Sequence, residues 1–218
     1  MIMQEASYEI IRGFEADALD VLERAGRTCY QSQAGATEGS AGPFVEGLLR
    51  RGHESVIEHA AITVRFVCDR GVANELVRHR LASFSQESTR YCRYGEHVTF
   101  VIPPWVDLGP GEYPSEVVMD FTEDEAQRRW LFAMAVAEQS YLSMLRHGWR
   151  PEQARSVLPM STKTEIVVTA NPREWRHIFK LRCSEAAHPQ IRELMVPLCT
   201  EMEAMCPEVF GGLMKQAA

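Results

Sequence analysis

The segment from Thr122 to His147 constrains the fold most, because it predicts one long helix. Apolar residues recur along it at helical spacing. Thr122 and Glu125 match a capping box at its start, and Gly148 stands where a helix would end. At 1.5 Å per residue, such a helix is about 39 Å long. The longest uncharged apolar run, 130–137, lies inside it and falls well short of the roughly twenty residues that a membrane span needs.

The rest of the chain predicts a mixture of helices and a few strands. Helices outnumber strands and the two do not alternate regularly, which is typical of an α+β fold with helices packed on a small antiparallel sheet. No linker divides the chain, so a single domain over residues 1–218 is expected. The predicted helices are 14–30, 44–51, 71–80, one from Asn171, and 188–205, broken or kinked at Pro197; the strands are 61–68, 91–103 and 165–169; the loops are 31–43 and 107–115.

Composition excludes several classes of protein. The hydrophobic fraction of 45% is that of a globular chain, and a net charge of −7 with a pI near 5.6 argues against a general nucleic-acid binder. Twenty arginines stand against three lysines. This excess reflects either a genomic bias or a need for guanidinium groups that recognise phosphates or carbonyl edges.

The cysteines and the N-terminus indicate a cytoplasmic protein. The six cysteines form no CxxC pair and no metal-ligand spacing with histidine, so they are expected to be reduced and no metal is predicted. The first residues lack the basic and apolar regions of a signal peptide. Neither GxGxxG nor a P-loop is present, so a dinucleotide cofactor would need another kind of site.

Cationic residues are densest over positions 78–90. Arg78, His79 and Arg80 are followed by Arg90, with small hydrogen-bonding side chains between them. Basic residues also stabilise the C-terminal end of a helix, which would explain the first three without a ligand. The full set suits one or two phosphates and a polar heterocycle.

A predicted helix start at Asn171 provides a second candidate anion site. Asn171 is a good N-cap, and Arg173 adds charge to the positive end of the helix dipole. Arg173 and His177 share one side of this helix, whereas Arg182 shares a stripe with apolar residues. Arg182 therefore points inward or toward a partner, or it extends past the edge of the core.

Two further positions are ambiguous on their own. His53 and Ser55 are either loop donors that face a ligand or part of a polar turn; an HxxEH zinc motif would need histidine at position 55. Arg155 lies in a short turn bounded by prolines and would ordinarily be a surface arginine.

Four segments together resemble a known family. Arg78-His79-Arg80, seven residues and then Ser88 match RHRx7S, the signature of flavin-dependent thymidylate synthases. Three segments in the expected order support the resemblance: GHESxxEH at 52–59, ARxxLP at 154–159, and the helix from Asn171 that ends in Leu181-Arg182. The resemblance covers residues from about 45 to 200.

The resemblance implies an activity and an assembly. The enzyme would convert dUMP to dTMP by reductive methylation, with 5,10-methylenetetrahydrofolate as the carbon donor and tightly bound FAD, reduced by NADPH, as the hydride source. It would be a homotetramer with active sites shared between subunits, and without nucleic-acid or membrane partners.

The resemblance also assigns residues by position. Arg182 would be catalytic and polarise the uracil ring, and His53 and Tyr91 would lie near the folate and NADPH. The FAD contacts would be Ser55, Arg78, His79, Arg80, Gln86, Asn171, Arg173 and His177. The dUMP contacts would be Glu75, Arg78, Gln86, Glu87, Ser88, Thr89, Arg90, Arg155 and Arg182.

Three positions qualify this assignment. Some relatives carry an amide where this chain has Glu75, and a carboxylate there would repel a phosphate. Some carry asparagine at the position of His177, which can donate the same hydrogen bond. Ser88 has no general base near it in sequence, so a substrate-binding role is expected rather than nucleophilic attack.

Two other classes of function remain open from the residues alone. A nucleotide- or RNA-binding helical module would use the arginine cluster without catalysis, with affinity that falls steeply as salt rises. A helical oligomer without a ligand would pair its arginines with the thirty acidic residues across interfaces.

Overall fold

The computed structural model describes residues 1–115 and 121–214. Contacts divide the chain into two units. Unit 1 consists of Met1–Ser7, Phe66–Leu76 and Ser85–Ile166, and unit 2 consists of Tyr8–Arg65, Val77–Phe84 and the chain from Val167.

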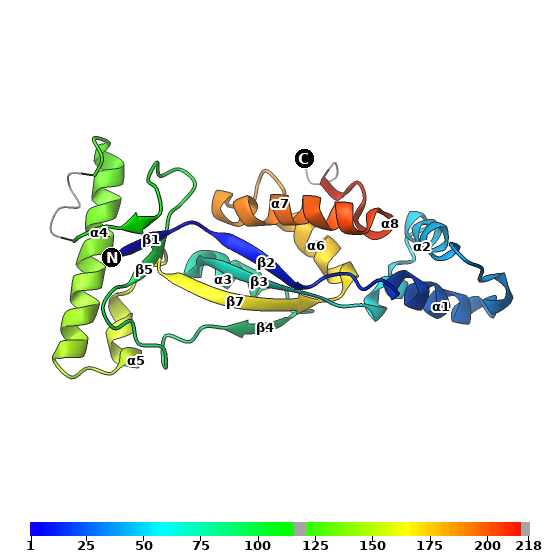
Figure 1. Cartoon of the computed structure of the whole chain (residues 1–218), viewed down its shortest axis with the longest axis horizontal. Helices are drawn as coiled ribbons and strands as arrows, with labels where there is room; N and C mark the ends of the chain where they lie inside the picture. Colours follow the sequence, from blue (N-terminus) through cyan, green and yellow to red (C-terminus); the bar gives the residue numbers. More distant parts are fainter. Residues whose placement is uncertain (116–120, 215–218) are drawn as a thin grey trace. The chain divides into compact units, whose positions relative to one another are not determined.

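Helices and strands are mixed along the chain, as expected. In order, the elements are β1 (Ile2–Gln4), β2 (Ser7–Arg12), α1 (Ala18–Tyr30), the 3₁₀ helix η1 (Gln33–Gly35), α2 (Ala41–Arg50), the 3₁₀ helix η2 (Glu54–His59), β3 (Ile62–Asp69), α3 (Arg70–Leu76), β4 (Ser83–Gln86), β5 (Thr99–Val101), β6 (Gly111–Glu112), α4 (Glu125–Arg146), α5 (Pro151–Ala154), the 3₁₀ helix η4 (Arg155–Val157), β7 (Lys163–Ala170), α6 (Pro172–Arg182), α7 (Pro189–Met205) and α8 (Pro207–Phe210) (Figure 1).

The strands form two sheets. The order of one is β5-β1-β6, and the order of the other is β2-β3-β7-β4. In the first sheet β1 pairs with β5 in parallel and with β6 in antiparallel orientation, so that Met3 stands between Phe100 and Gly111. The prediction of an antiparallel sheet is wrong for this part, because β1 and β5 come from distant parts of the chain and run in the same direction.

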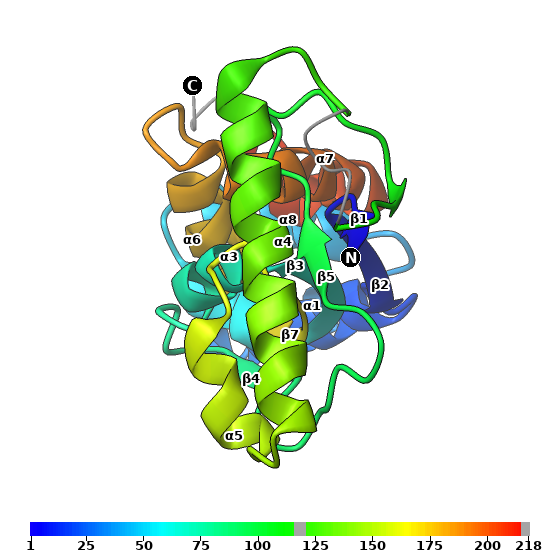
Figure 2. The same ribbon diagram turned by 90° about the vertical axis from the view of Figure 1, so that its left-hand side faces the viewer.

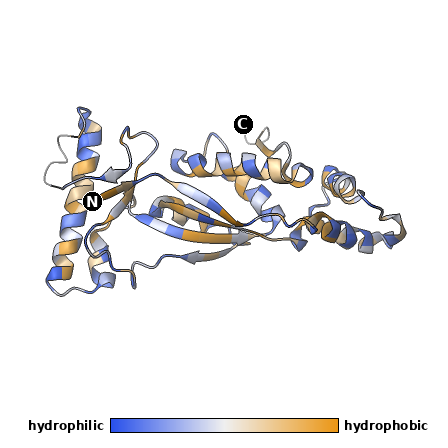
Figure 3. Ribbon diagram, in the orientation of Figure 1, coloured by the Kyte–Doolittle hydropathy of each residue, from blue (hydrophilic) through white to orange (hydrophobic). Residues whose placement is uncertain are grey.

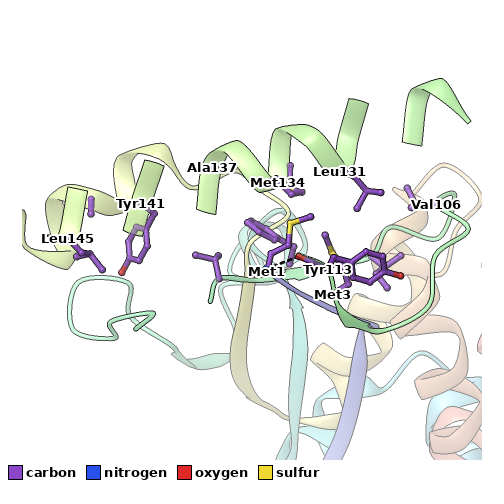
Figure 4. Packing of buried hydrophobic residues seen from close by; sticks show 14 residues of the cluster. Met1, Met3, Val106, Tyr113, Leu131, Met134, Ala137, Tyr141 and Leu145 are labelled. Carbon is purple, nitrogen blue, oxygen red and sulfur yellow. Dashed lines mark hydrogen bonds between the residues drawn. The ribbon is translucent and has the colours of Figure 1, made fainter. Parts of the chain in front are cut away.

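The core of unit 1 lies between α4 and the three-stranded sheet. Leu131, Met134 and Tyr141 of α4 are buried against Met3 and Phe100 of the strands (Figures 2 and 4). Figure 3 shows hydrophilic and hydrophobic residues interspersed along α4, and the buried residues of this helix pack against the core. The predicted long helix is therefore present, and its stripe forms the core contact.

The start of α4 differs from the predicted capping box. The N-cap is Asp124, whose carboxylate accepts a hydrogen bond from the backbone N–H of Gln127 at 2.9 Å. The hydroxyl of Thr122 instead accepts from the backbone N–H of Asp124. Two capping residues stand close together in the sequence here, and the aspartate is the better N-cap of the two.

A buried carboxylate connects three segments of unit 1. Glu138 of α4 accepts hydrogen bonds from the backbone N–H of Val98 at 2.6 Å and from the hydroxyl of Ser115 at 3.1 Å. It also forms an ion pair at 2.8 Å with the α-ammonium group of Met1, which is fully buried. These contacts neutralise a charge that would otherwise be costly inside the core.

In unit 2, α6 is held by its buried side. Trp175, Ile178 and Phe179 are completely buried, and the indole N–H of Trp175 donates to the carbonyl of Ile62 in β3 at 3.1 Å. The predicted N-cap is confirmed, because Asn171 accepts a hydrogen bond from the N–H of Glu174 at 2.9 Å. α7 packs beside α6 and continues through Pro197 as one helix rather than two (Figure 1).

Other boundaries differ from the sequence expectations. The helix predicted over 71–80 ends at Leu76, so the Arg78-His79-Arg80 cluster follows α3 rather than closing it. The strand predicted over 91–103 is reduced to β5, and the predicted loops contain η1 and β6. The strands β1, β2 and β4 were not predicted; β2 is largely exposed and therefore lacks an apolar pattern.

Two general expectations can be compared with the described residues. All six cysteines have free thiols. None of the helices within 1–115 and 121–214 combines the length and apolar character that crossing a bilayer requires.

The contacts of Glu138 lead to a test of stability. Glu138→Ala should lower the free energy of unfolding by about 3 kcal/mol or more, because it leaves the Met1 ammonium and the Val98 N–H buried without this partner. Urea unfolding followed by circular dichroism measures this loss. Gln139→Ala, at the exposed neighbouring position, is the control; equal stability of the two variants would contradict the role assigned to Glu138.

Candidate functional site

Unit 2 contains a cavity of about 840 Å³ in which cationic side chains predominate. Its walls come from η2, from the segment after α3, and from α6 with its N-cap. The lining residues are Glu54, Glu58, Arg78, His79, Arg80, Leu81, Asn171, Arg173, Glu174, Arg176, His177, Lys180, Leu181, Arg182 and Leu213.

Seven residues predicted from sequence line this one cavity. They are Arg78, His79, Arg80, Asn171, Arg173, His177 and Arg182. Ser55 and His53 do not line it. Ser55 is exposed on η2 between the lining residues Glu54 and Glu58, and His53 Nδ1 lies 3.3 Å from the hydroxyl of Tyr30.

Arg173 is held at the mouth of the cavity by two carboxylates. Its guanidinium donates to Glu58 at 2.5 Å and lies 3.6 Å from Glu54. The hydrogen bond to Glu58 raises the pKa of the arginine, and about half of its side chain is exposed. The arginine is therefore oriented at the N-terminus of α6, where the backbone N–H groups favour anions.

His79 forms the buried centre of the cavity wall. The Nε–H of Arg182 donates to its Nε2 at 3.1 Å, and its Nδ1 lies 3.5 Å from Oε1 of Glu174. The ring of His177 stands edge-on to the imidazole, with ring centres 5.8 Å apart. His79 and Glu174 are 4% and 5% exposed. One imidazole thus lies between an arginine and a carboxylate.

The environment keeps this imidazole neutral. Burial, with smaller contributions from the nearby Arg182 and His177, lowers the pKa of His79 from 6.5 to about 4. Burial also raises the pKa of Glu174, an effect that His177 opposes. The site therefore disfavours the cationic form of His79 and the anionic form of Glu174.

Sequence reasoning missed Glu174 as a site residue. The third position of a capped helix is a common place for glutamate, so the residue was explained by its effect on the helix. Only its backbone N–H contributes to the cap, and its carboxylate faces His79. The presence of a histidine in the signature 78–80 gave no indication of which carboxylate it would meet.

His79, Glu174 and His177 are also close enough for a metal site, since one ligand atom from each lies within 4.8 Å of the others. The hydrogen bonds oppose this use. Nε2 of His79 accepts from Arg182, so Nδ1 of the neutral ring carries the proton and has no lone pair to offer. An arginine bonded to the same ring would also repel a metal ion. These residues do not fit a metal.

Unit 1 brings together a second set of predicted residues. The guanidinium of Arg155 donates to the buried hydroxyl of Thr89 at 3.1 Å, and Gln86 donates to Thr164 at 3.3 Å. The hydroxyl of Ser88 accepts from the backbone N–H of Arg90 at 3.3 Å. These contacts fix the segment that follows β4 and connect it to η4, where Arg155 lies.

The other residues of this set differ in exposure and contacts. The guanidinium of Arg90 lies over the ring of Tyr91, 5.2 Å from its centre, and Tyr91 is 76% exposed. Glu75 is half-buried on α3. The carboxylate of Glu87 accepts from Lys163 at 3.1 Å and from the hydroxyl of Tyr94 at 2.9 Å. Its charge is therefore already balanced within the protein.

The sequence matches one family over most of its length. Residues 13–208 match the family described as thymidylate synthase complementing protein. A flavin-dependent thymidylate synthase of Mycobacterium sp. (strain JLS) is 33% identical over 202 residues, which cover 88% of this chain and 78% of the relative. A relative of the same description in Mycobacterium tuberculosis (strain ATCC 25177 / H37Ra) is 33% identical over 199 residues, with the same coverage.

Solved structures show the same fold. The UMP/dUMP methylase PolB of Streptomyces cacaoi, bound with 5-Br dUMP, has a TM-score of 0.79 at 25% identity and covers 100% of this chain and 98% of its own. Thymidylate synthase X of Helicobacter pylori, with FAD and dUMP, has a TM-score of 0.74 at 22% identity. The match covers 96% of this chain and 99% of the Helicobacter pylori chain.

The mixed fold is that of the UMP/dUMP methylase PolB, and unit 2 adds a cavity rich in cationic side chains. The chain belongs to the flavin-dependent thymidylate synthase family. The resemblance seen in the signature segments is confirmed, and with it the class of enzyme, a flavin-dependent methyltransferase.

The neutral state of His79 leads to a prediction of pH dependence. The unfolded chain binds a proton at this residue below pH 6.5, whereas the folded protein does so only near pH 4, so acidification favours unfolding. Glu174, whose pKa is raised in the folded state, acts in the opposite direction. Through this residue, the free energy of unfolding of the parent protein should fall by about 2 kcal/mol between pH 7 and pH 5. We expect His79→Gln to abolish this decrease.

Urea midpoints at the two pH values measure this difference. Glutamine can still accept the hydrogen bond from Arg182, so the variant should fold. His147→Gln, at an exposed position at the end of α4, is the control. An unchanged pH dependence in His79→Gln would show that this imidazole is not held neutral.

Proposed function

We propose that this chain converts dUMP to dTMP, with 5,10-methylenetetrahydrofolate as the carbon donor and FAD reduced by NADPH as the hydride source. The observation that carries the proposal is the single cavity in which the RHR cluster meets α6. Family membership gives the class of reaction, and the cavity supplies charges suited to its cofactor and substrate.

The residues of unit 2 fit FAD. A volume of about 840 Å³ lies in the ordinary range of ligand sites, and the two phosphates of FAD suit Arg78, Arg80 and Arg173. The N-terminus of α6, capped by Asn171, offers backbone N–H groups to a phosphate. We assign His79 and His177 as further contacts, with Ser55 of η2 and Gln86 of unit 1 as predicted contacts outside the cavity wall.

The residues of unit 1 suit the nucleotide substrate. We assign Gln86, Ser88, Thr89, Arg90 and Arg155 to dUMP, because they combine two guanidinium groups with hydroxyl and amide donors on one braced segment. Arg78 and Arg182 of unit 2 complete the predicted set. Glu75 and Glu87 remain predicted contacts, and a carboxylate would suit the sugar or base better than the phosphate.

Arg182 has the central role in the proposed mechanism. C5 of uracil is a poor nucleophile, and a guanidinium at the edge of the ring stabilises the negative charge that develops on the ring when it is activated. Reduced FAD, when bound, would supply the hydride that completes the methyl group. The protein contributes orientation and charge: Arg182 is held by His79, and its cation is partly withdrawn from water.

Ser88 is assigned to substrate binding. Its hydroxyl oxygen accepts from the N–H of Arg90, and its nearest neighbours in sequence, Glu87 and Thr89, are engaged with Lys163 and Arg155. A serine nucleophile needs a base that takes its proton. These hydrogen bonds support the segment as a ligand site, and none of them joins the Ser88 hydroxyl to a base that could take its proton, as attack on C6 would require.

We also propose a homotetramer with sites shared between subunits, acting in the cytoplasm. Two large apolar side chains that line the cavity are exposed, with Leu81 78% and Leu181 47% exposed. A neighbouring subunit would cover them.

The free thiols of all six cysteines are consistent with a reducing compartment. His53 and Tyr91 are the residues that we place near the folate and NADPH.

The proposed reaction is tested by turnover of labelled dUMP. The purified protein should be yellow and release tritium from [5-³H]dUMP in the presence of the folate, FAD and NADPH. Arg182→Ala should lose at least about 100-fold in turnover, because it removes charge stabilisation in the transition state, while flavin absorbance persists.

Ser88→Ala is the comparison for this experiment. Its loss should be smaller than that of Arg182→Ala, because it removes one binding contact. A wholly inactive Ser88→Ala that binds both ligands normally would favour the nucleophile instead. A parent protein that takes up no FAD would contradict the proposed function itself.

The assembly is tested by the mass of the particle in solution. Light scattering after gel filtration should give four times the chain mass of 24.7 kDa. Leu81→Glu should reduce this mass, because a charge would be buried in the interface. Glu123→Gln, at a fully exposed side chain, is the control, and a monomeric parent would contradict the shared site.

A further inference from the structure

We propose that Glu174 is a positioning residue that acts through His79 to hold the guanidinium of Arg182. The inference rests on the proposed function, in which Arg182 faces the uracil ring. It adds a residue that belongs neither to the predicted FAD contacts nor to the predicted dUMP contacts. All three side chains line the same cavity of unit 2.

The hydrogen bonds determine which nitrogen of His79 carries the proton. Arg182 can only donate, so Nε2 of His79 must be the acceptor in the 3.1 Å bond. A neutral imidazole has one N–H, and it must therefore be at Nδ1. That nitrogen lies 3.5 Å from Oε1 of Glu174, which can accept its proton. The direction of the chain is Arg182 to His79 to Glu174.

Glu174 favours the one tautomer that can hold Arg182. In the other tautomer the Nε2–H of His79 would face the Nε–H of Arg182, and two donors would oppose each other. The carboxylate favours the proton on the opposite nitrogen. The distance of 3.5 Å is at the long limit of a hydrogen bond, and such contacts in a ligand site often shorten when the ligand binds.

The orientation of the arginine matters because Arg182 is the last residue of α6. Its side chain has several rotatable bonds, and the hydrogen bond from Nε to His79 restrains the plane of the guanidinium. The bond to His79 uses Nε, so the two terminal nitrogens lie outside it. Their N–H groups can donate to a carbonyl oxygen at the edge of the uracil ring.

The burial of Glu174 is costly and therefore calls for an explanation. Its side chain is about as buried as that of His79, and burial raises its pKa. Exposed glutamates nearby, such as Glu58, are paired with arginine instead. A buried carboxylate without such a partner is more often found where it controls another group. Its helical position contributes a partial compensation from the helix dipole.

Two substitutions separate orientation from packing. Glu174→Gln keeps an oxygen that accepts from Nδ1, whereas Glu174→Leu has similar bulk and no acceptor. Neither changes the backbone N–H that Asn171 caps. Glu185→Leu, at an exposed position just after α6, is the control for replacing a glutamate by leucine.

The expected result is a selective loss in turnover. Glu174→Leu should lower kcat about tenfold, because the guanidinium is no longer aligned with the ring, whereas KM for dUMP and flavin absorbance change little. Glu174→Gln should recover most of kcat. If both variants lose kcat equally, or if KM changes instead, the inference is wrong.

A double variant tests whether Glu174 acts through Arg182. In the Arg182→Ala background, Glu174→Leu should have no further effect on kcat, because the group that it positions is gone. If kcat of the double variant falls by the product of the two single losses, Glu174 acts independently of Arg182 and the inference is wrong.

The tautomer of His79 gives a readout without catalysis. In ¹⁵N-histidine-labelled protein, the signal that disappears in His79→Gln should show the proton on Nδ1, and this state should be lost in Glu174→Leu. A proton on Nε2 in the parent would overturn the inference whatever the activity. If the parent protein shows the expected tautomer but makes no dTMP, the proposed function is wrong, whereas the link between Glu174 and His79 is upheld.

Discussion

The burial of one side of α6 determines where the charged residues of unit 2 lie. Trp175, Ile178 and Phe179 exclude water, and the hydrogen bond from Trp175 to Ile62 fixes the helix against β3. With that side fixed, helical geometry sends Arg173 and Arg182 to the cavity from opposite ends of α6. Displacement of this apolar contact would move every cation that the helix contributes.

The cavity concentrates positive charge, and the protein limits the repulsion in two ways. Arg173 is balanced by Glu54 and Glu58. Arg182 donates from its Nε to a neutral imidazole, which orients the guanidinium without adding a charge of its own. An arginine that must stabilise charge on a substrate needs the second arrangement, because a carboxylate partner would compete with the developing anion.

The sequence predicted two charged segments that line one cavity better than it predicted the elements around them. The capped helix from Asn171 and the signature at 78–80 follow from local patterns, and both are found in one cavity. The helix over 71–80 was overextended, because its basic residues resembled a C-terminal turn. The strand β2 was missed because its exposed residues show no apolar alternation. Glu174 could not be identified from sequence, since its partner His79 lies far away along the chain.

The contacts of Lys163 explain why this position has a lysine in a chain that otherwise favours arginine. Its ammonium group contacts both Glu87 at 3.1 Å and Glu165 at 2.5 Å. A compact cation with three donors can bridge two carboxylates, whereas the planar fork of arginine favours one. Because Glu87 directly precedes Ser88, this bridge keeps an unbalanced carboxylate from facing a phosphate in the proposed nucleotide site. In the proposed site, the lysine would therefore support anion binding without touching the anion.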